Sequence, residues 1–216
     1  MALQAYRKIS DLPGVFPVFP LTGALLLPRG TLPLNIFEPR YLNMIDDAMA
    51  GDRLIGMVQN FGDDAVKPSL MQVGCAGRIT SYSETDDGRY LIALTGIARF
   101  RVATERDVTT PYRQIDADWS DFAHDLAPPS LGDLPKRETL ISALRAYVAR
   151  NEMHADWESV ADAPIETLIN ALCAGCPFAP PEKQALIEAA TLRDRCETLI
   201  ALLDMDMPGG DEGTLQ

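Results

Sequence analysis

The hydrophobic positions change their spacing along the chain, from strand-like in the first half to helical in the second. Short apolar runs bounded by Pro, Gly and Asp predict strands over residues 15–21, 24–27, 53–59, 73–83, 89–95, 98–104 and 112–119. After residue 136 the apolar residues recur at helical spacing, as in the stripe formed by Ile165, Leu168, Ile169 and Leu172. The pattern therefore predicts a strand-rich part followed by an all-helical part, which is an α+β organisation.

One helix interrupts the strand-rich part and gives the sharpest local signal. Between residues 38 and 50 a single helical face carries Tyr41, Met44, Ile45, Ala48 and Met49. Pro39 suits the first turn because its missing N–H is not needed there. Glu38 places a negative charge at the positive end of the helix dipole, and Gly51 is a suitable stop.

The composition changes near residue 120. Residues 120–135 contain Pro128, Pro129, Gly132 and Pro135, which break regular structure and predict a linker. We therefore expect one domain over residues 1–120, a helical subdomain over 121–206 and a disordered acidic tail over 207–216.

Several motifs, taken in their order, resemble the N-terminal substrate-binding domain of the Lon proteases. They are FPVFPL from residue 16, LPLNIFEPRY from residue 32, VGCAGRI from residue 73, DGRY from residue 87, GIARF from residue 96, and the helical segments 181–188 and 192–199. The resemblance covers nearly the whole chain and implies a PUA-like β-barrel followed by a C-terminal α-helical subdomain. The motif Phe37, Glu38, Pro39, Arg40 and Tyr41 belongs to that family's fold, so we expect its charged pair to have a structural role.

A full Lon protease also carries an ATPase and a Ser–Lys proteolytic domain. The sequence contains no GxxxxGK[ST] phosphate loop and no GxSxG elbow. It also ends where a substrate-binding domain would end. The resemblance therefore implies a stand-alone, non-catalytic binding module without a cofactor.

The charge of the chain bears on its partners. The net charge is −12 and the pI is about 4.5, whereas nucleic-acid binding depends on basic patches that neutralise phosphates. The densest basic group is Arg78, Arg89, Arg99 and Arg101. A basic cleft built from these four would favour RNA or small-molecule binding by the barrel; without one, we do not expect nucleic acid as a partner.

The chain has no apolar run near the roughly 20 residues that a membrane span needs. Its first 14 residues lack the apolar core of a signal peptide. We therefore expect a cytoplasmic protein without membrane contact, whose cysteines are reduced.

Cys173 and Cys176 form a CxxC, a spacing found in redox and zinc sites. Cys173 lies at the C-terminal end of a predicted helix, where the dipole does not lower a thiol pKa. Cys75 and Cys196 do not stand at zinc-site spacing. Since both members of the CxxC continue an apolar stripe, we interpret them as core residues.

Metal and catalytic sites find little support elsewhere. His124 and His154 have no second ligand at metal spacing, and we expect both to be exposed beside carboxylates. No nucleophile–base pair is visible, so an unrecognised enzyme is the weakest of three hypotheses. We expect no metal.

Two features are candidates for binding. The first is the loop over residues 60–71 with its neighbouring strand, where Met57, Phe61, Leu70 and Met71 are suited to adaptable peptide contacts. The second is the seam between the two parts. The alternative is that the four residues only close the barrel.

The favoured hypothesis is a module that recognises exposed apolar segments of unfolded or tagged polypeptides, as a holdase or as an adaptor for an ATP-dependent protease. The alternative is small-molecule or RNA binding through the barrel.

Overall fold

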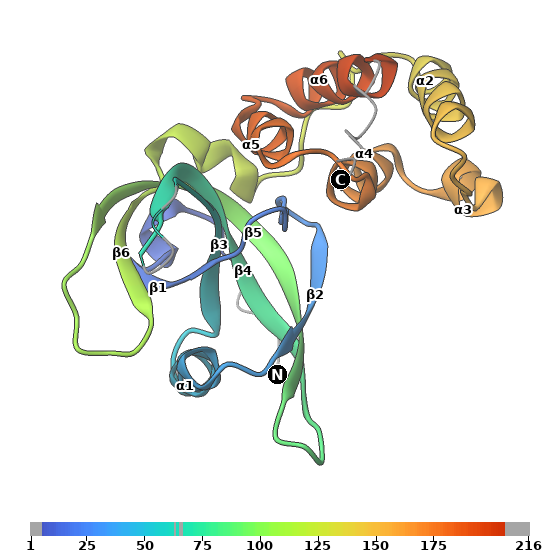
Figure 1. Cartoon of the computed structure of the whole chain (residues 1–216). Coiled ribbons are helices and arrows are strands. Elements are labelled where there is room, and N and C mark those ends of the chain that lie inside the picture. The colour runs from blue at the N-terminus through green and yellow to red at the C-terminus, as the bar shows by residue number, and fades with distance from the viewer. Residues whose placement is uncertain (1–5, 63, 65–66, 206–216) are drawn as a thin grey trace.

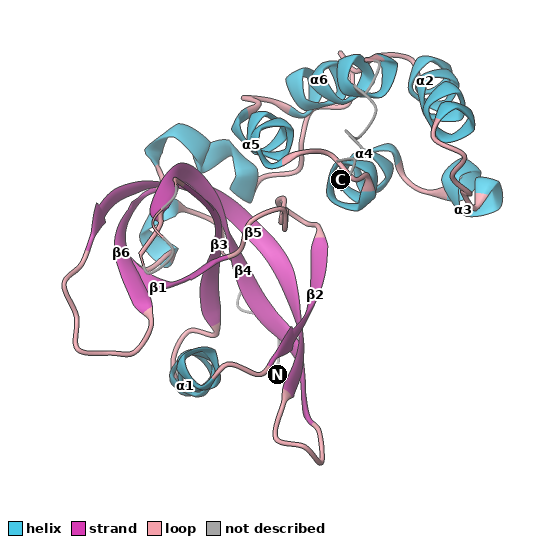
Figure 2. Cartoon of the chain, in the orientation of Figure 1, coloured by secondary structure: helices cyan, strands magenta, loops and turns pink. Residues whose placement is uncertain are grey.

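The computed structural model of the chain describes residues 6–62, 64 and 67–205. The tail predicted over 207–216 lies outside the described residues. The chain folds into a strand-rich part followed by helices, the α+β organisation that the sequence predicts (Figure 2).

Five strands close a barrel, and a sixth lies outside the ring. Around the ring the order is β1–β3–β4–β5–β6, with β6 returning to β1. The β1–β3 contact is parallel and the other four are antiparallel. The strands are β1 Val15–Pro20, β2 Thr31–Ile36, β3 Leu54–Phe61, β4 Ser69–Glu84, β5 Tyr90–Glu105 and β6 Arg113–Asp118.

Strand β2 is bonded to the first half of β5, with Thr31 opposite Thr95 and Ile36 opposite Tyr90. The second half of β5 is bonded to β6. Because β5 is long enough to pair with both β2 and β6 along the same side, β2 stays outside the ring, and no other described strand pairs with its second edge.

Two strand predictions were wrong, and they share a cause. The predicted strands 89–95 and 98–104 are one strand, β5, which runs from Tyr90 to Glu105 because Gly96 is not a turn. Ile97 is the extra residue of a β-bulge between the pairs Gly77–Gly96 and Ala76–Ala98. A Cβ at Gly96 would lie 2.0 Å from the carbonyl oxygen of Leu27, so glycine permits the close approach of another segment.

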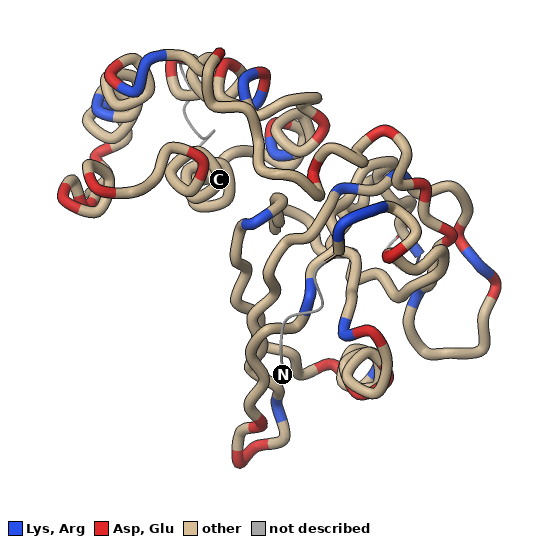
Figure 3. The backbone as a smooth tube through the Cα atoms, turned by 180° about the vertical axis from the view of Figure 1, so that it is seen from behind, with Lys and Arg blue, Asp and Glu red and all other residues tan. Residues whose placement is uncertain are grey.

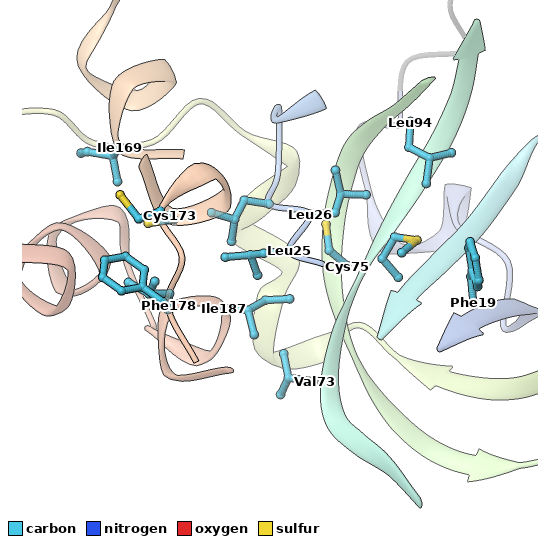
Figure 4. Close-up of a cluster of buried hydrophobic side chains, with 14 of the residues drawn as sticks. Phe19, Leu25, Leu26, Val73, Cys75, Leu94, Ile169, Cys173, Phe178 and Ile187 are labelled. Atoms are coloured by element: carbon cyan, nitrogen blue, oxygen red, sulfur yellow. The ribbon is translucent and has the colours of Figure 1, made fainter. Parts of the chain in front are cut away.

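That approaching segment is 24–27, which is not a strand. Its leucines are buried, and Leu25 and Leu26 lie between the sheet and the helices near Cys173 and Phe178 (Figure 4). The apolar run therefore reflects burial between two layers of the molecule rather than pairing in the sheet.

Helix α1, Pro39–Ala50, forms as predicted and lies across the barrel from the other helices (Figure 1). It buries Tyr41, Met44, Ile45 and Ala48, and the Tyr41 ring lies 4.2 Å from that of Phe19. Arg40 Nη2 pairs with Glu38 Oε2 at 2.8 Å, which confirms the local pairing expected for the fold motif.

The helical region begins directly after β6. It comprises η2 Ser120–Leu126, α2 Arg137–Arg150, α3 Trp157–Asp162, α4 Ile165–Gly175, α5 Pro180–Glu188 and α6 Leu192–Asp204, while a short η1 Ile9–Asp11 precedes β1. Thr191 caps α6 by accepting from Asp194 N. One hydrophobic cluster runs from the barrel into α2, α4, α5 and α6, so the two parts share a core.

Candidate functional site: the seam and the open edge of β2

The seam is the contact between the barrel and the helical region, and a buried arginine holds its centre. Arg99 on β5 is 1% exposed and bonds Asp125 of η2 through Nε at 2.8 Å and Nη2 at 2.9 Å. Its Nη1 donates to the Ile187 carbonyl at 3.0 Å and its Nη2 to that of Ala190 at 3.1 Å. One guanidinium thus ties the barrel to η2 and to the turn between α5 and α6.

The partner of Arg99 stays ionised despite its burial. Desolvation raises the pKa of the Asp125 carboxyl, but the hydrogen bonds and charge of Arg99 outweigh it and hold the pKa below its usual value. A buried charge without a partner would be costly, so the two residues depend on one another.

Amide side chains continue the seam towards β3 and α5. Gln59 Nε2 lies 3.1 Å from both the Pro180 carbonyl and Gln184 Oε1, and Gln184 Nε2 donates to the Val73 carbonyl at 3.2 Å. Lys183 Nζ donates to the Gly23 carbonyl at 2.8 Å. These polar groups are buried and partnered, so the barrel and helices have one defined arrangement here.

At its other end the seam opens into a pocket of about 240 Å³, the seam pocket. Its lining comprises residues 25–27, Arg29, Gly30, Thr31, Glu166, Thr167, Asn170, Ala171 and Ala174. Arg29 Nε pairs with Glu166 Oε1 at 2.6 Å, and Arg29 Nη1 donates to the Asp125 carbonyl at 2.6 Å. The exposed residues Thr167 and Ala171 are small, which leaves room between α4 and the barrel.

Strand β2 starts at this pocket, since Thr31 is both its first residue and part of the pocket lining. Among the described strands β2 is hydrogen-bonded only to β5, so its other side is an open edge. No charged residue occurs from Thr31 to Phe37. Phe37, just past the strand, is 61% exposed, and Leu91, opposite Asn35 on β5, is 44% exposed.

Comparison with known proteins identifies the family. Residues 15–205 match the model of the ATP-dependent protease La (LON) substrate-binding domain. This chain belongs to that family. It is 26% identical over 213 residues to Lon protease 2 of Myxococcus xanthus and 26% over 207 residues to the Lon protease of Anaeromyxobacter dehalogenans.

These matches cover 94% and 90% of this chain but 25% and 23% of the two relatives, so the chain spans about a quarter of their length. The fold is also that of solved Lon N-terminal domains. The Lon N-terminal domain protein from Xanthomonas campestris superposes with a TM-score of 0.59 at 24% identity, covering 87% of this chain and 97% of that one. The N-terminal domain of Mycobacterium avium complex Lon protease gives 0.63 at 15% identity, covering 89% and 100%.

The predicted peptide contacts of this Lon-type domain do not form one surface. Met57 is 3% exposed and Leu70 is 9% exposed, and they belong to two different core clusters. Met71 is partly buried. Phe61, 52% exposed, is the member that a ligand reaches most readily. Because β4 starts at Ser69, Leu70 and Met71 lie in a strand rather than in the expected loop.

The four arginines of the basic group do not form one free basic surface. Arg99 is enclosed in the seam, Arg101 pairs with Asp121, and Arg89 pairs with Asp87 at 2.8 Å on the β4–β5 hairpin. Arg78 Nη1 donates to the Tyr6 hydroxyl at 3.0 Å. Figure 3 shows Lys and Arg dispersed among acidic residues, so these four do not build the basic cleft that would favour RNA.

A larger cleft of about 430 Å³ lies between α1 and the β5–β6 connection. Its four cations among the described residues have acidic partners: Arg113 Nε lies 2.9 Å and Lys67 3.0 Å from Glu105, Arg40 pairs with Glu38, and Arg106 lies 3.7 Å from Asp116. Arg113 and Lys67 share the single carboxylate of Glu105, so the two cations are only partly neutralised by it.

The cysteines lie in the core, as interpreted from the sequence. Cys173 and Cys176 are 0% and 6% exposed, and burial raises their pKa values to about 12 and about 11. Cys75 and Cys196 are buried too. Across the described ranges, no three His, Cys, Asp or Glu side chains are grouped to hold a metal ion.

His154 is exposed, as expected. His124 is half exposed, but its Nε2 lies 3.2 Å from Arg99 Nη2 and 3.0 Å from the Ala190 carbonyl, so it joins the seam. Sequence reasoning did not find this role, nor those of Arg29 and Asp125. An arginine between Ala98 and Phe100 in an apolar strand is the signal that could have identified Arg99.

No helix of the described chain has the length and apolar character that crossing a membrane requires.

Proposed function

We propose that this Lon-type domain binds polypeptide segments in extended conformation by adding them to the open edge of β2, with no catalytic step of its own. The observation that carries the proposal is the uncharged edge itself, which runs from the seam pocket to the exposed Phe37. An unpaired strand edge offers backbone donors and acceptors to any extended chain, whatever its sequence.

The length and charge of the edge define the ligand. Six strand residues span about 20 Å, so the bound segment is short. Pro33 marks this side as the open edge, because a proline within a sheet is tolerated where its nitrogen faces no partner strand. It offers no donor itself, so an added segment bonds the backbone groups on either side of it. The surrounding net charge of −12 favours apolar segments flanked by basic residues.

Such binding fits the family to which the chain belongs, whose model is described as substrate-binding. The clients would be unfolded or tagged proteins, held in the cytoplasm for refolding or for an ATP-dependent protease. Exposed Phe61 is a further proposed contact, on a different part of the barrel surface.

The test compares two substitutions at one exposed residue of β2. Asn35→Pro removes a backbone N–H from the same side of the strand as Pro33, whereas Asn35→Ala keeps it. Binding is measured on peptides tiled over a permanently unfolded protein, such as reduced and carboxymethylated lactalbumin. We expect Asn35→Ala to bind as the wild type does and Asn35→Pro to bind about tenfold more weakly, the loss of roughly one backbone hydrogen bond.

A second measurement controls for misfolding of Asn35→Pro. Peptides methylated at alternate backbone nitrogens lack the N–H donors that strand pairing needs, and they are tested on the unchanged wild-type protein. Equal binding of methylated and unmethylated peptides contradicts strand addition. Binding of RNA that neither substitution changes would favour the alternative function.

A further inference from the structure

We infer that the seam pocket selects one apolar side chain, of the size of leucine or phenylalanine, from the polypeptide bound along β2. This inference rests on the proposed function and adds a sequence preference to it. The backbone edge alone recognises an extended chain without regard to its side chains, so any selectivity must come from a pocket beside the edge.

The position of the pocket connects it to the edge. Thr31 begins β2, and together with Gly30 it lines the pocket opposite Thr167 and Ala171 of α4. Figure 1 shows α4 beside the end of β2 at which the strand begins. A strand paired with β2 therefore has one end beneath α4, and the side chain at that end is the one within reach of the pocket.

The size of the pocket sets the kind of group. Its volume of about 240 Å³ lies below the roughly 300–1,000 Å³ of pockets that hold drug-sized ligands. An apolar cavity of about 150 Å³ is large enough for a benzene ring. The pocket therefore suits one large side chain rather than a whole small molecule or two neighbouring side chains.

The charges of the pocket exclude ionised groups. Its lining contains one cation and one anion, Arg29 and Glu166, and these are paired at 2.6 Å. Arg29 also donates to the carbonyl of Asp125, which fixes its guanidinium at the rim. A charged side chain entering the pocket loses water without gaining a free counter-ion, whereas an apolar one contacts the methyl groups of Ala171 and Ala174.

Substitution of Ala171 by leucine fills the pocket without disturbing the core. Ala171 is exposed on α4, and leucine is a good helix former. Ala146 is also exposed, on α2 away from the seam, and Ala146→Leu is the matched control. The probe is the tightest-binding peptide from the tiled set, labelled with fluorescein, with each position changed in turn to Ala, Leu, Asp or Lys.

In the wild type and in Ala146→Leu we expect one terminal position of the bound segment to prefer Leu over Ala by about tenfold, the free energy of burying about two methylene groups. Asp and Lys at that position should bind more weakly than Ala. In Ala171→Leu the preference at that position should disappear, while every other position keeps its profile.

Two results separate this inference from the proposed function. If Ala171→Leu and Ala146→Leu give the same profile at every position while Asn35→Pro still weakens binding, the pocket inference is overturned and strand addition stands. If Asn35→Pro and Asn35→Ala bind alike, strand addition fails, and the pocket inference fails with it. A preference for a charged residue at the terminal position also overturns the pocket inference.

Discussion

Two arginines reach η2 across the seam, and they differ in what surrounds them. Arg99 is 1% exposed and bonds the carboxylate of Asp125, while the Arg29 side chain is 36% exposed and bonds the carbonyl of the same residue. Arg99 closes the seam through a buried, hydrogen-bonded ion pair, and Arg29 forms the rim of the seam pocket. The difference shows how one contact between two parts of a molecule can be rigid at its centre and accessible at its end.

The largest effect should come from breaking the closed end. Arg99→Met removes the positive charge beside the buried Asp125 carboxylate, which keeps only the backbone N–H of residue 99 at 3.0 Å as a donor from β5, and we expect it to lower the free energy of unfolding by about 4 kcal/mol. Urea titration followed by circular dichroism measures the loss. Arg101→Met, two residues further along β5, removes an exposed pair and should cost less than about 0.5 kcal/mol.

A double substitution sharpens this test. Arg99→Met with Asp125→Leu removes both charges and should recover much of the lost stability, because a buried pair replaced by apolar groups is often neutral. Equal losses in Arg99→Met and Arg101→Met would show that the seam does not depend on the enclosed pair.

Lowering the pH should weaken the contact between Arg99 and Asp125 over a defined pH range. The folded-state pKa of Asp125 lies below its usual value, so its ionised form adds stability above about pH 4, and this stability is lost as pH falls further through the folded pKa. Asp125→Asn should be about 3 kcal/mol less stable than the wild type at pH 7. This difference in the free energy of unfolding between the wild type and Asp125→Asn should become smaller between pH 4 and pH 2. Urea titration at each pH measures it.

Asp121→Asn provides the control, because Asp121 belongs to an exposed pair and its substitution should give no comparable gap. A gap for Asp125→Asn that stays constant down to pH 2 would rule out Asp125 as the titrating group.

Among the substitutions in the seam, the smallest effect should come from its open end. Arg29→Met removes a pair that is partly solvated on both sides, so we expect a loss below about 1 kcal/mol in the same urea titration. A loss of stability as large as that of Arg99→Met would mean that Arg29 also holds the seam together. That result would contradict the proposed difference between Arg99 and Arg29.

Sequence reasoning predicted best where the signals are local. Helix α1 was predicted because its apolar face and Pro39 lie within a few turns of one another, and the α+β organisation followed from the change in hydrophobic spacing. The order of the family's motifs also identified the family that the comparisons show.

The errors lie where distant segments meet. The run of three leucines at 25–27 was predicted as a strand, because sequence alone cannot show that helices α4 and α5 lie against it. Met57 was proposed as a peptide contact because of its side-chain chemistry. In the structure it is 3% exposed and belongs to the larger core cluster. The seam as a place of binding stays a prediction, and the sequence could not locate its pocket, which brings together Arg29 and Glu166, 137 residues apart.

The most direct test of the central claim is amide hydrogen exchange of the wild-type protein with and without its tightest-binding peptide. Strand addition predicts slower exchange in residues 31–36, at the amides that face the open edge, with smaller changes in the segment around Ala171. Protection confined to other regions, such as the surface around Phe61, with exchange in β2 unchanged, would contradict the account.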